Sequence, residues 1–237
     1  MKRNQSGFTL IEIAIVLVII GLLLGGVLKG QELINSAKVK NLATDFKNIP
    51  IFIYGYQDKF KALPGDDNTI GTATTHLTGG IPCTGAPAVN AGHCAVGNGT
   101  IDGPWDSISA TDESYVFWQH VRLAGLAPGS TDTTLPSGVG YLPTNAAGGT
   151  IGIQSNIGFT TITKNSTSAP SLMTGSYIIC SQGILGKFAA QLDTTLDDGN
   201  TDTGSMRVAD PLNNGQSVST ATVNANPGQA YTVCMGI

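Results

Sequence analysis

The strongest pattern in the chain is an apolar run near its beginning. From Phe8 to Leu28 nearly every residue is apolar, and no charge occurs between Ile13 and Leu28. As an α-helix at ~1.5 Å per residue the run spans roughly 31 Å, about the thickness of one hydrocarbon core. Lys2 and Arg3 precede the run. The pattern therefore predicts a membrane-spanning helix whose amino-terminal end is cytoplasmic.

The helical pattern continues beyond the apolar run as an amphipathic segment. Its apolar residues recur mostly at three- and four-residue steps: Ile34, Ala37, Leu42, Phe46, Ile49, Ile53, Tyr56 and Phe60. Pro50 lacks a backbone donor, so we expect a kink or a local break between Phe46 and Pro50. The Pro-Gly turn signal in residues 63–67 predicts the end of the helix.

The rest of the chain predicts one more substantial helix and several short strands. Residues 109–124 fit a helix that Ser109 and Asp112 would open as a loose capping box and Gly125 would end. Strand patterns cover residues 150–153, 157–163, 175–180, 204–208 and 229–235, with a short helix over residues 184–192. We therefore predict an α+β fold, in which a long amino-terminal helix packs on a small antiparallel sheet with extensive loops.

Composition and charge narrow the function classes. Only 12% of residues are charged, and 31 of 237 are glycine. Residues 29–61 hold six lysines and three acidic residues, a balance of +3, whereas residues 62–237 hold four basic and twelve acidic residues, a balance of −8. A basic stretch beside an apolar run suits a membrane surface, and the acidic remainder would repel nucleic acid. We therefore expect no nucleic-acid partner.

The four cysteines predict disulfides if the bulk of the chain lies outside the cytoplasm. Four cysteines permit three pairings. We favour Cys83–Cys94, which would close a short loop, and Cys180–Cys234, which would join two predicted strands. Free buried thiols are the alternative. A zinc site is disfavoured, because His93 and Cys94 have no companion at metal-ligand spacing.

A carboxylate within the apolar run sets it apart from an ordinary signal sequence. Glu12 lies four residues after Phe8. An intramembrane carboxylate costs ~2.5–3.5 kcal/mol on insertion scales, so it indicates a function and needs a partner. A secretory signal would have its small-residue cleavage site after the apolar run, but here Gly7 precedes it. Cleavage at Gly7 would remove the charged leader and keep the helix.

These residues carry a resemblance to a known family. The sequence GFTLIE at residues 7–12, after a short basic leader and before about twenty apolar residues, resembles the prepilin processing signal of type IV pilins and type II secretion pseudopilins. The resemblance implies that a prepilin peptidase cuts between Gly7 and Phe8 and methylates the new amine of Phe8. It also implies that Glu12 neutralises the terminal amine of a neighbouring subunit during assembly, since a buried carboxylate and ammonium are tolerable as a pair.

Two further segments are similar to parts of pilin-like proteins, namely FKALPGD at residues 60–66 and WQHVRLAGLAPG at residues 118–129. The resemblance also implies that a glycine-marked stretch of the helix loosens on assembly. The corresponding glycines are Gly21, Gly25, Gly26 and Gly30. This chain departs from the family pattern at Lys29, where many relatives have a helix-breaking proline.

Together these features predict an organisation and a place in the cell. We expect a leader at residues 1–7, a membrane or filament-core half of the helix at 8–30, an amphipathic half at 31–62, and a β-rich globular domain at 63–237. The expected location is the bacterial inner membrane, crossed once with the amino terminus cytoplasmic, and after assembly a periplasmic or surface filament. Expected partners are other pilin or pseudopilin subunits, the prepilin peptidase, the inner membrane and the assembly platform.

The globular part offers little chemistry. Asp198, Asn200 and Asp202 alternate as in a calcium loop, but the following glycine is one residue late and no closing glutamate is present. We therefore expect an acidic turn and no cofactor, with calcium as the one alternative. No nucleophile motif occurs, so we expect no enzyme.

Three functional hypotheses follow. The first is a minor pilin or pseudopilin, since the globular part is large and rich in loops, and the second is a major pilin. The third is a membrane-anchored periplasmic binding protein, which would need a ligand pocket and would function without prepilin peptidase.

Overall fold

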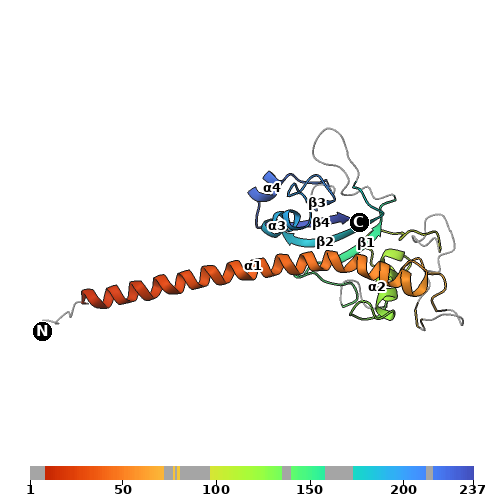
Figure 1. Cartoon of the computed structure of the whole chain (residues 1–237), viewed down its shortest axis with the longest axis horizontal. Coiled ribbons are helices and arrows are strands. Elements are labelled where there is room, and N and C mark those ends of the chain that lie inside the picture. Colours follow the sequence, from red (N-terminus) through yellow and green to blue (C-terminus); the bar gives the residue numbers. More distant parts are fainter. Residues whose placement is uncertain are drawn as a thin grey trace. The chain divides into compact units, whose positions relative to one another are not determined.

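The computed structural model describes residues 9–71, 77, 79–80, 97–134, 140–157, 173–211 and 216–237. Its helices are α1 (Leu10–Phe60), α2 (Glu113–Leu123), α3 (Gly186–Leu196) and α4 (Thr220–Ala225). Its strands are β1 (Ile151–Ser155), β2 (Tyr177–Leu185), β3 (Met206–Ala209) and β4 (Ala230–Gly236) (Figure 1). By contacts the chain divides into two units, residues 1–38 and 39–237. The predicted domain boundaries stay predictions.

The α+β arrangement is confirmed. The four strands form one antiparallel sheet in the order β1-β2-β4-β3. Strand β4, the last element along the chain, lies between β2 and β3 and pairs with both. The helix half from Val39 onward shares its hydrophobic core with this sheet.

Alternation along the strands gives the sheet two faces with different packing. Ile179 of β2 and Val233 of β4 belong to the main core, which also contains residues of α1, α2 and α3. Their chain neighbours Cys180 and Cys234 belong to a smaller cluster on the opposite face, with Trp105. Both faces of the sheet are therefore covered. Because successive side chains of a strand point to opposite faces, neighbouring residues join different clusters.

Helix α1 is continuous across Pro50, so the predicted local break is wrong. Pro50 removes one backbone hydrogen bond, but the turns on either side of it are fixed by buried side chains. Phe46, Ile49 and Ile53 are 1%, 2% and 1% exposed, respectively. Packing of these residues offsets the loss of the hydrogen bond.

Helix α2 exists, but its predicted beginning is wrong. It starts at Glu113, and its N-cap is Asp112, whose side chain makes no capping hydrogen bond. The carboxylate of Asp112 instead accepts a hydrogen bond of 2.6 Å from Ser107. The predicted end of the helix is confirmed. Gly125 has φ 75°, and its backbone amide donates to the carbonyl oxygen of Arg122, while the backbone amide of Leu126 donates to the carbonyl oxygen of Val121. This pair of bonds is a Schellman motif.

The remaining predicted elements are largely present. Four of the five strand patterns correspond to β1, β2, β3 and β4, and the 184–192 pattern corresponds to α3. The predicted short helix began two residues too early, since Ile184 and Leu185 belong to β2. Of the pattern at 157–163, Ile157 lies in a turn and the other residues are outside the described part of the chain.

Candidate functional site

The amino-terminal turn of α1 is built by a reciprocal pair of side chains. Thr9 precedes the helix, and both its backbone amide and its hydroxyl donate to Oε2 of Glu12, at 2.8 and 2.7 Å. The amide of Glu12 in turn donates to the Thr9 hydroxyl at 3.4 Å. This is a capping box, which satisfies donors that a helix start leaves unpaired. The Glu12 carboxylate therefore has a partner within its own chain.

The capping role of Thr9 is a feature that the sequence analysis missed. Its signal was present, because Thr9-x-x-Glu12 is the capping-box pattern. The same pattern was placed at Ser109, where the structure does not form it. Gly7 and Phe8, the predicted processing residues, lie outside the described part of the chain.

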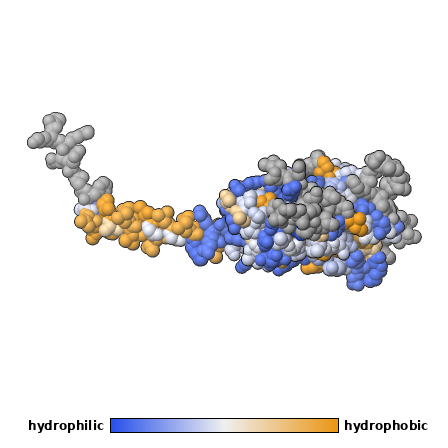
Figure 2. Space-filling model, turned by 90° about the horizontal axis from the view of Figure 1, so that it is seen from above, coloured by the Kyte–Doolittle hydropathy of each residue, from blue (hydrophilic) through white to orange (hydrophobic). Residues whose placement is uncertain are grey.

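The first part of α1 exposes its apolar side chains all round. Leu10, Leu17, Leu22 and Leu28 are 89%, 64%, 73% and 66% exposed, and Figure 2 shows a largely apolar surface along this part of the helix. By length and composition α1 could cross a membrane, and its most apolar window has a mean hydropathy of 2.8. An apolar surface of this extent fits a membrane or a protein partner.

The second part of α1 carries a one-sided apolar stripe. Five residues of the predicted stripe are buried, namely Leu42, Phe46, Ile49, Ile53 and Tyr56, and Val39 and Ala43, which were not predicted, are buried with them. All of these except Tyr56 belong to the same hydrophobic core as residues of the sheet. Tyr56 is also fully buried. Ile34 and Ala37, which the sequence analysis added to this stripe, are exposed instead.

The turn after α1 packs directly against α2. The amide of Gly65 donates to Nδ1 of the buried His120 at 3.0 Å. Gly65 has φ +97°, and a Cβ there would lie 2.7 Å from the Glu113 carbonyl oxygen. Only glycine fits this conformation and this contact without strain. The two segments that resemble pilin-like proteins, residues 60–66 and 118–129, therefore meet in one structural unit.

A buried tyrosine–carboxylate bond ties this turn back to the helix. The Tyr56 hydroxyl donates to Asp67 at 2.7 Å. Burial, together with the Asp67 bond, raises the pKa of Tyr56. Burial alone would raise the pKa of Asp67, but hydrogen bonds from Thr69 and Tyr56 outweigh it, and the pKa is lowered. The Tyr56–Asp67 bond and the Gly65–His120 bond thus hold the turn after α1 from two sides.

Arg122 holds the loop that follows α2. Its Nε and Nη1 donate to the carbonyl oxygens of Pro128 and Ser130, at 3.0 and 2.8 Å. Its guanidinium also lies 5.1 Å from the centre of the Tyr141 ring. Burial lowers the pKa of Arg122. The loop is therefore fixed by a cation that nearby carbonyls and aromatic rings compensate.

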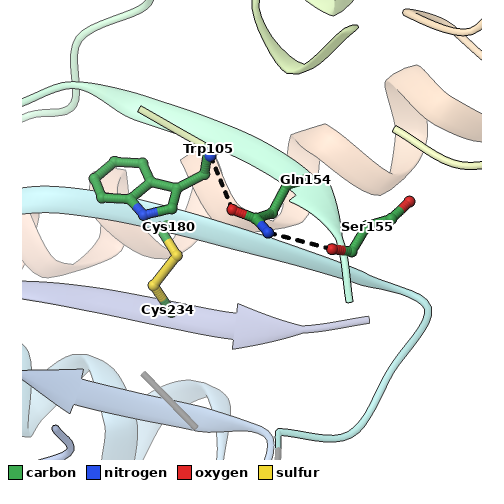
Figure 3. The surroundings of a disulfide bond; sticks show 5 residues. All are labelled: Trp105, Gln154, Ser155, Cys180 and Cys234. Atoms are coloured by element: carbon green, nitrogen blue, oxygen red, sulfur yellow. Dashed lines mark hydrogen bonds between the residues drawn. A yellow bond between two sulfur atoms is a disulfide. The ribbon is translucent and has the colours of Figure 1, made fainter. Parts of the chain in front are cut away.

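Cys180 and Cys234 form a disulfide, in agreement with the favoured pairing. They stand directly opposite each other on β2 and β4, with Cα atoms 4.1 Å apart. Trp105 lies beside the bond (Figure 3), and its backbone amide donates to Gln154 at 2.9 Å. The other favoured pair, Cys83–Cys94, lies outside the described residues.

The calcium candidates lie on a turn that uses some of their oxygens. The carboxylate of Asp198 accepts hydrogen bonds from the Asn200 amide at 2.8 Å and the Thr203 hydroxyl at 3.3 Å. Among the residues that the structure describes, no three His, Cys, Asp or Glu side chains are grouped to hold a metal ion. Calcium binding by Asp198, Asn200 and Asp202 therefore stays an untested alternative.

A buried carboxyl group lies next to this turn. Asp193 on α3 is fully buried. Its burial and the nearby Asp197 and Asp198 raise its pKa to about 7, against a smaller lowering effect from the Gly199 amide. Sequence reasoning missed Asp193, because nothing in its neighbourhood along the chain marks it as buried.

One comparison with known proteins finds a match. Residues 2–28 match the family model of the prokaryotic N-terminal methylation motif. The match covers the leader, the Thr9–Glu12 pair and the exposed apolar part of α1. No curated protein and no solved structure matches the chain.

Proposed function

We propose that the chain, whose residues 2–28 carry the prepilin-type cleavage and methylation signal of type IV pilins and pseudopilins, is a minor pilin or a pseudopilin. The observation that carries this proposal is the signal itself, joined to one helix with two surfaces. The early part of α1 is apolar and exposed, and the later part is packed into a sheet-containing core. A subunit anchored by its helix and built into a polymer through it needs this division.

Processing would create the reactive end of the subunit. The prepilin peptidase would cut between Gly7 and Phe8 and methylate the Phe8 amine, which makes Glu12 the fifth residue of the mature chain. In the filament, the Glu12 carboxylate would neutralise the terminal amine of a neighbouring subunit. Each charge alone is costly in an apolar surrounding, and the pair is tolerable.

The Thr9–Glu12 pair supports the proposed role of Glu12, because it stabilises the carboxylate in the subunit before assembly. Two donors of Thr9 bind one oxygen of Glu12, at 2.7 and 2.8 Å. They reduce the cost of keeping a carboxylate at the membrane before assembly. Oε1 of Glu12 receives neither of these bonds and could accept one from an incoming amine. The carboxylate could therefore pass from capping its own helix to pairing with a neighbour without being protonated.

Membrane storage before assembly follows from the same helix. Lys2 and Arg3 would hold the amino terminus in the cytoplasm, and residues after Lys29 would lie on the far side of the inner membrane. The Cys180–Cys234 disulfide fits an oxidising compartment there. Assembly would involve other pilin or pseudopilin subunits and the assembly platform.

The minor-subunit proposal rests on the large, loop-rich globular part. A major pilin and a membrane-anchored periplasmic binding protein are the competing hypotheses. Amino-terminal sequencing with and without prepilin peptidase separates the last of these from the filament subunits. We expect the mature chain to begin at a methylated Phe8 only when the peptidase is present. A chain that begins at Met1 in both cases overturns the proposal.

Abundance and phenotype separate minor from major subunits. Quantitative mass spectrometry of purified filaments should find the chain at a small fraction of the main subunit. Deletion of the chain, scored separately for protein secretion, surface motility and DNA uptake, then identifies the machine. A chain that makes up most of the filament mass would instead be a major pilin.

A further inference from the structure

The segment before α2 contains the dipeptide Asn98–Gly99, and both residues are exposed. In an Asn-Gly pair the backbone nitrogen of the glycine readily attacks the side-chain carbonyl carbon of the asparagine, because glycine has no side chain to crowd the nitrogen. Gly99 has φ +81°, and a Cβ at this position would meet no heavy atom within 4 Å. The two groups that can react are therefore neighbours in the chain and lie at the surface, where water reaches them.

The side-chain amide of Asn98 is held at both of its ends. Its Oδ1 accepts hydrogen bonds from the backbone amide and the hydroxyl of Thr100, at 2.8 and 2.6 Å. Its Nδ2 donates to Oδ2 of Asp102 at 2.8 Å. The bond to the amide two residues along is an Asx turn, which folds the side chain back over the peptide bond between residues 98 and 99. The carbonyl carbon of Asn98 is therefore kept on the side of the nitrogen that would attack it.

The two donors on Oδ1 of Asn98 have the arrangement of an oxyanion hole. When a nucleophile adds to the carbonyl carbon, negative charge develops on this oxygen, and donors already in place stabilise it. The Thr100 hydroxyl has a second acceptor, Oδ1 of Asp102, at 3.0 Å, but its contact with Asn98 is the shorter one. Because hydrogen bonds to charged oxygens are stronger, Thr100 stabilises the transition state more than the ground state.

The attacking nitrogen is in contact with a base. The backbone amide of Gly99 donates to Oδ2 of Asp66 at 2.7 Å. The same carboxylate also accepts hydrogen bonds from the backbone amides of Gly97 and Asn98, which fix its position. Asp66 is 6% exposed, and its burial raises the pKa of its carboxyl group although these amide bonds oppose the rise. A higher pKa makes the carboxylate a stronger base, so Asp66 is suited to take the proton that Gly99 must lose.

We propose that Asn98–Gly99 is a self-modifying site, at which the folded chain accelerates the deamidation of Asn98. The nitrogen of Gly99 forms a bond to Cγ of Asn98 while Asp66 takes its proton, and the bond from Cγ to Nδ2 then breaks. The leaving nitrogen takes a proton from water and departs as ammonia, and the proton on Asp66 neutralises the hydroxide that remains. Water is the one co-reactant, and the inference does not depend on the proposed function.

A second molecule of water completes the modification. It opens the cyclic imide at one of its two carbonyl carbons, which leaves aspartate or isoaspartate at position 98. Either product adds a negative charge beside Asp66 and Asp102, in a part of the chain where acidic residues already outnumber basic ones by twelve to four. Isoaspartate also routes the backbone through Cβ, which lengthens the turn. We expect the modified turn to be released from Asp66, so that older copies of the chain differ from new ones in this segment.

The first test compares the folded full-length chain in detergent with the same chain unfolded in guanidinium chloride, at equal pH and temperature. Peptide mapping by mass spectrometry follows the loss of unmodified Asn98 and the appearance of the imide, aspartate and isoaspartate. We expect Asn98 to be lost at least about tenfold faster in the folded chain, because a positioned proton acceptor gives ~10²–10⁴-fold in enzymes. Equal or slower loss in the folded chain overturns the inference, since the fold would then protect Asn98.

The second test removes one donor and leaves the rest of the turn in place. Asp66 also holds the backbone of residues 97–99, so its substitution would disturb the turn itself, and Thr100 offers the cleaner change. Thr100→Val removes the hydroxyl and keeps the backbone amide, whereas Thr100→Ser keeps both donors. One oxyanion-hole donor gives ~10²–10³-fold in a water-excluded site, and we expect a smaller effect, about tenfold, in this exposed turn.

The loss of Asn98 in folded Thr100→Val should therefore be about tenfold slower than in wild type, a change of the kind that removal of an oxyanion-hole donor produces. Thr100→Ser should react at nearly the rate of wild type, and all three chains should react alike when unfolded. Loss of Asn98 at the wild-type rate in folded Thr100→Val, or equally slow loss in Thr100→Ser, overturns the assignment of Thr100 and with it the inference.

Discussion

Thr9 and Glu12 bind each other through three hydrogen bonds, and the strongest two converge on a single carboxylate oxygen. The arrangement gives Glu12 two separable tasks. One is to cap α1 in its own chain, and the other is the proposed neutralisation of a neighbour's amine. Substitutions that affect one task and spare the other can tell them apart.

Glu12→Gln keeps hydrogen-bond acceptors for Thr9 but removes the charge. We expect Glu12→Gln and Glu12→Ala to be cut by the peptidase and to be poorly incorporated, because the neighbour's amine is then left without a counter-charge. Thr9→Val should weaken the cap by ~1 kcal/mol and still be incorporated. Immunoblots of membrane and filament fractions measure both steps. Normal incorporation of Glu12→Gln would show that capping, not charge, is what matters.

Gly65→Ala tests the contact between the turn after α1 and α2. Alanine at φ +97° is strained, and its Cβ would meet the Glu113 carbonyl oxygen at 2.7 Å. We expect a loss of roughly 3 kcal/mol in the free energy of unfolding. Gly125→Ala is the matched control, because Gly125 has φ +75° but open space around it; it should lose only ~1 kcal/mol. Denaturant unfolding of the detergent-solubilised chain measures both, and equal losses would contradict the packing argument.

The Cys180–Cys234 disulfide closes a loop with a sequence separation of 54. Replacing both cysteines by serine should lower the free energy of unfolding by ~2–4 kcal/mol, because the unfolded chain regains the freedom that the bond removes. Peptide mapping without reductant should find the Cys180–Cys234 linkage and, as the sequence predicts, a second linkage between Cys83 and Cys94. Finding Cys180 joined to Cys83 or Cys94 would contradict the structure.

The buried Asp193 predicts a pH dependence of stability. Its pKa is raised to about 7 in the folded protein, so folding favours the protonated form. Asp193 therefore stabilises the fold most at acidic pH and loses that contribution as the pH rises through about 7. Asp193→Asn should unfold at a higher temperature than wild type above pH 7, and the gap should shrink below pH 5. Asp106→Asn, at an exposed acid, is the control, and a constant gap would exclude titration of Asp193.

Calcium titration tests the remaining cofactor alternative. We expect millimolar calcium to leave the melting temperature unchanged, since Asp198 is already engaged by the Asn200 amide and the Thr203 hydroxyl. A rise in melting temperature that Asp198→Asn abolishes would instead establish a calcium site at this turn.

Periodicity was a good guide wherever one surface of an element is buried. It correctly predicted the buried stripe from Leu42 to Tyr56 and four of the strands. When one face of an element is buried, apolar residues must recur in the sequence with the period of that element. Periodicity failed at Ile34 and Ala37, which fit the spacing but lie beyond the part of α1 that contacts the core. The break expected at Pro50 came from the missing backbone donor instead, and the helix continues there because packing on both sides outweighs one lost hydrogen bond.

The part of the candidate site that could be predicted from sequence is Glu12, because it follows from the energetics of a charged group in an apolar helix alone. The cost of a carboxylate in an apolar helix drew attention to Glu12 without any structure. Thr9 was missed as its partner because the capping-box pattern also occurs elsewhere. The burial of Asp193, the order of the strands and the contact between Gly65 and His120 depend on residues far apart in sequence, and no local pattern contains them.

The position of β4 has a consequence for how the subunit is made. This last strand lies in the middle of the sheet and pairs with both β2 and β3. The sheet therefore cannot close, and the disulfide between β2 and β4 cannot form, until the chain has left the ribosome as far as Met235. Helix α1 and strands β1 to β3 are all made before β4, so they wait for β4 before the sheet is complete. A chain truncated before Ala230 would therefore keep α1 and the other strands but lack the strand that joins β2 to β3.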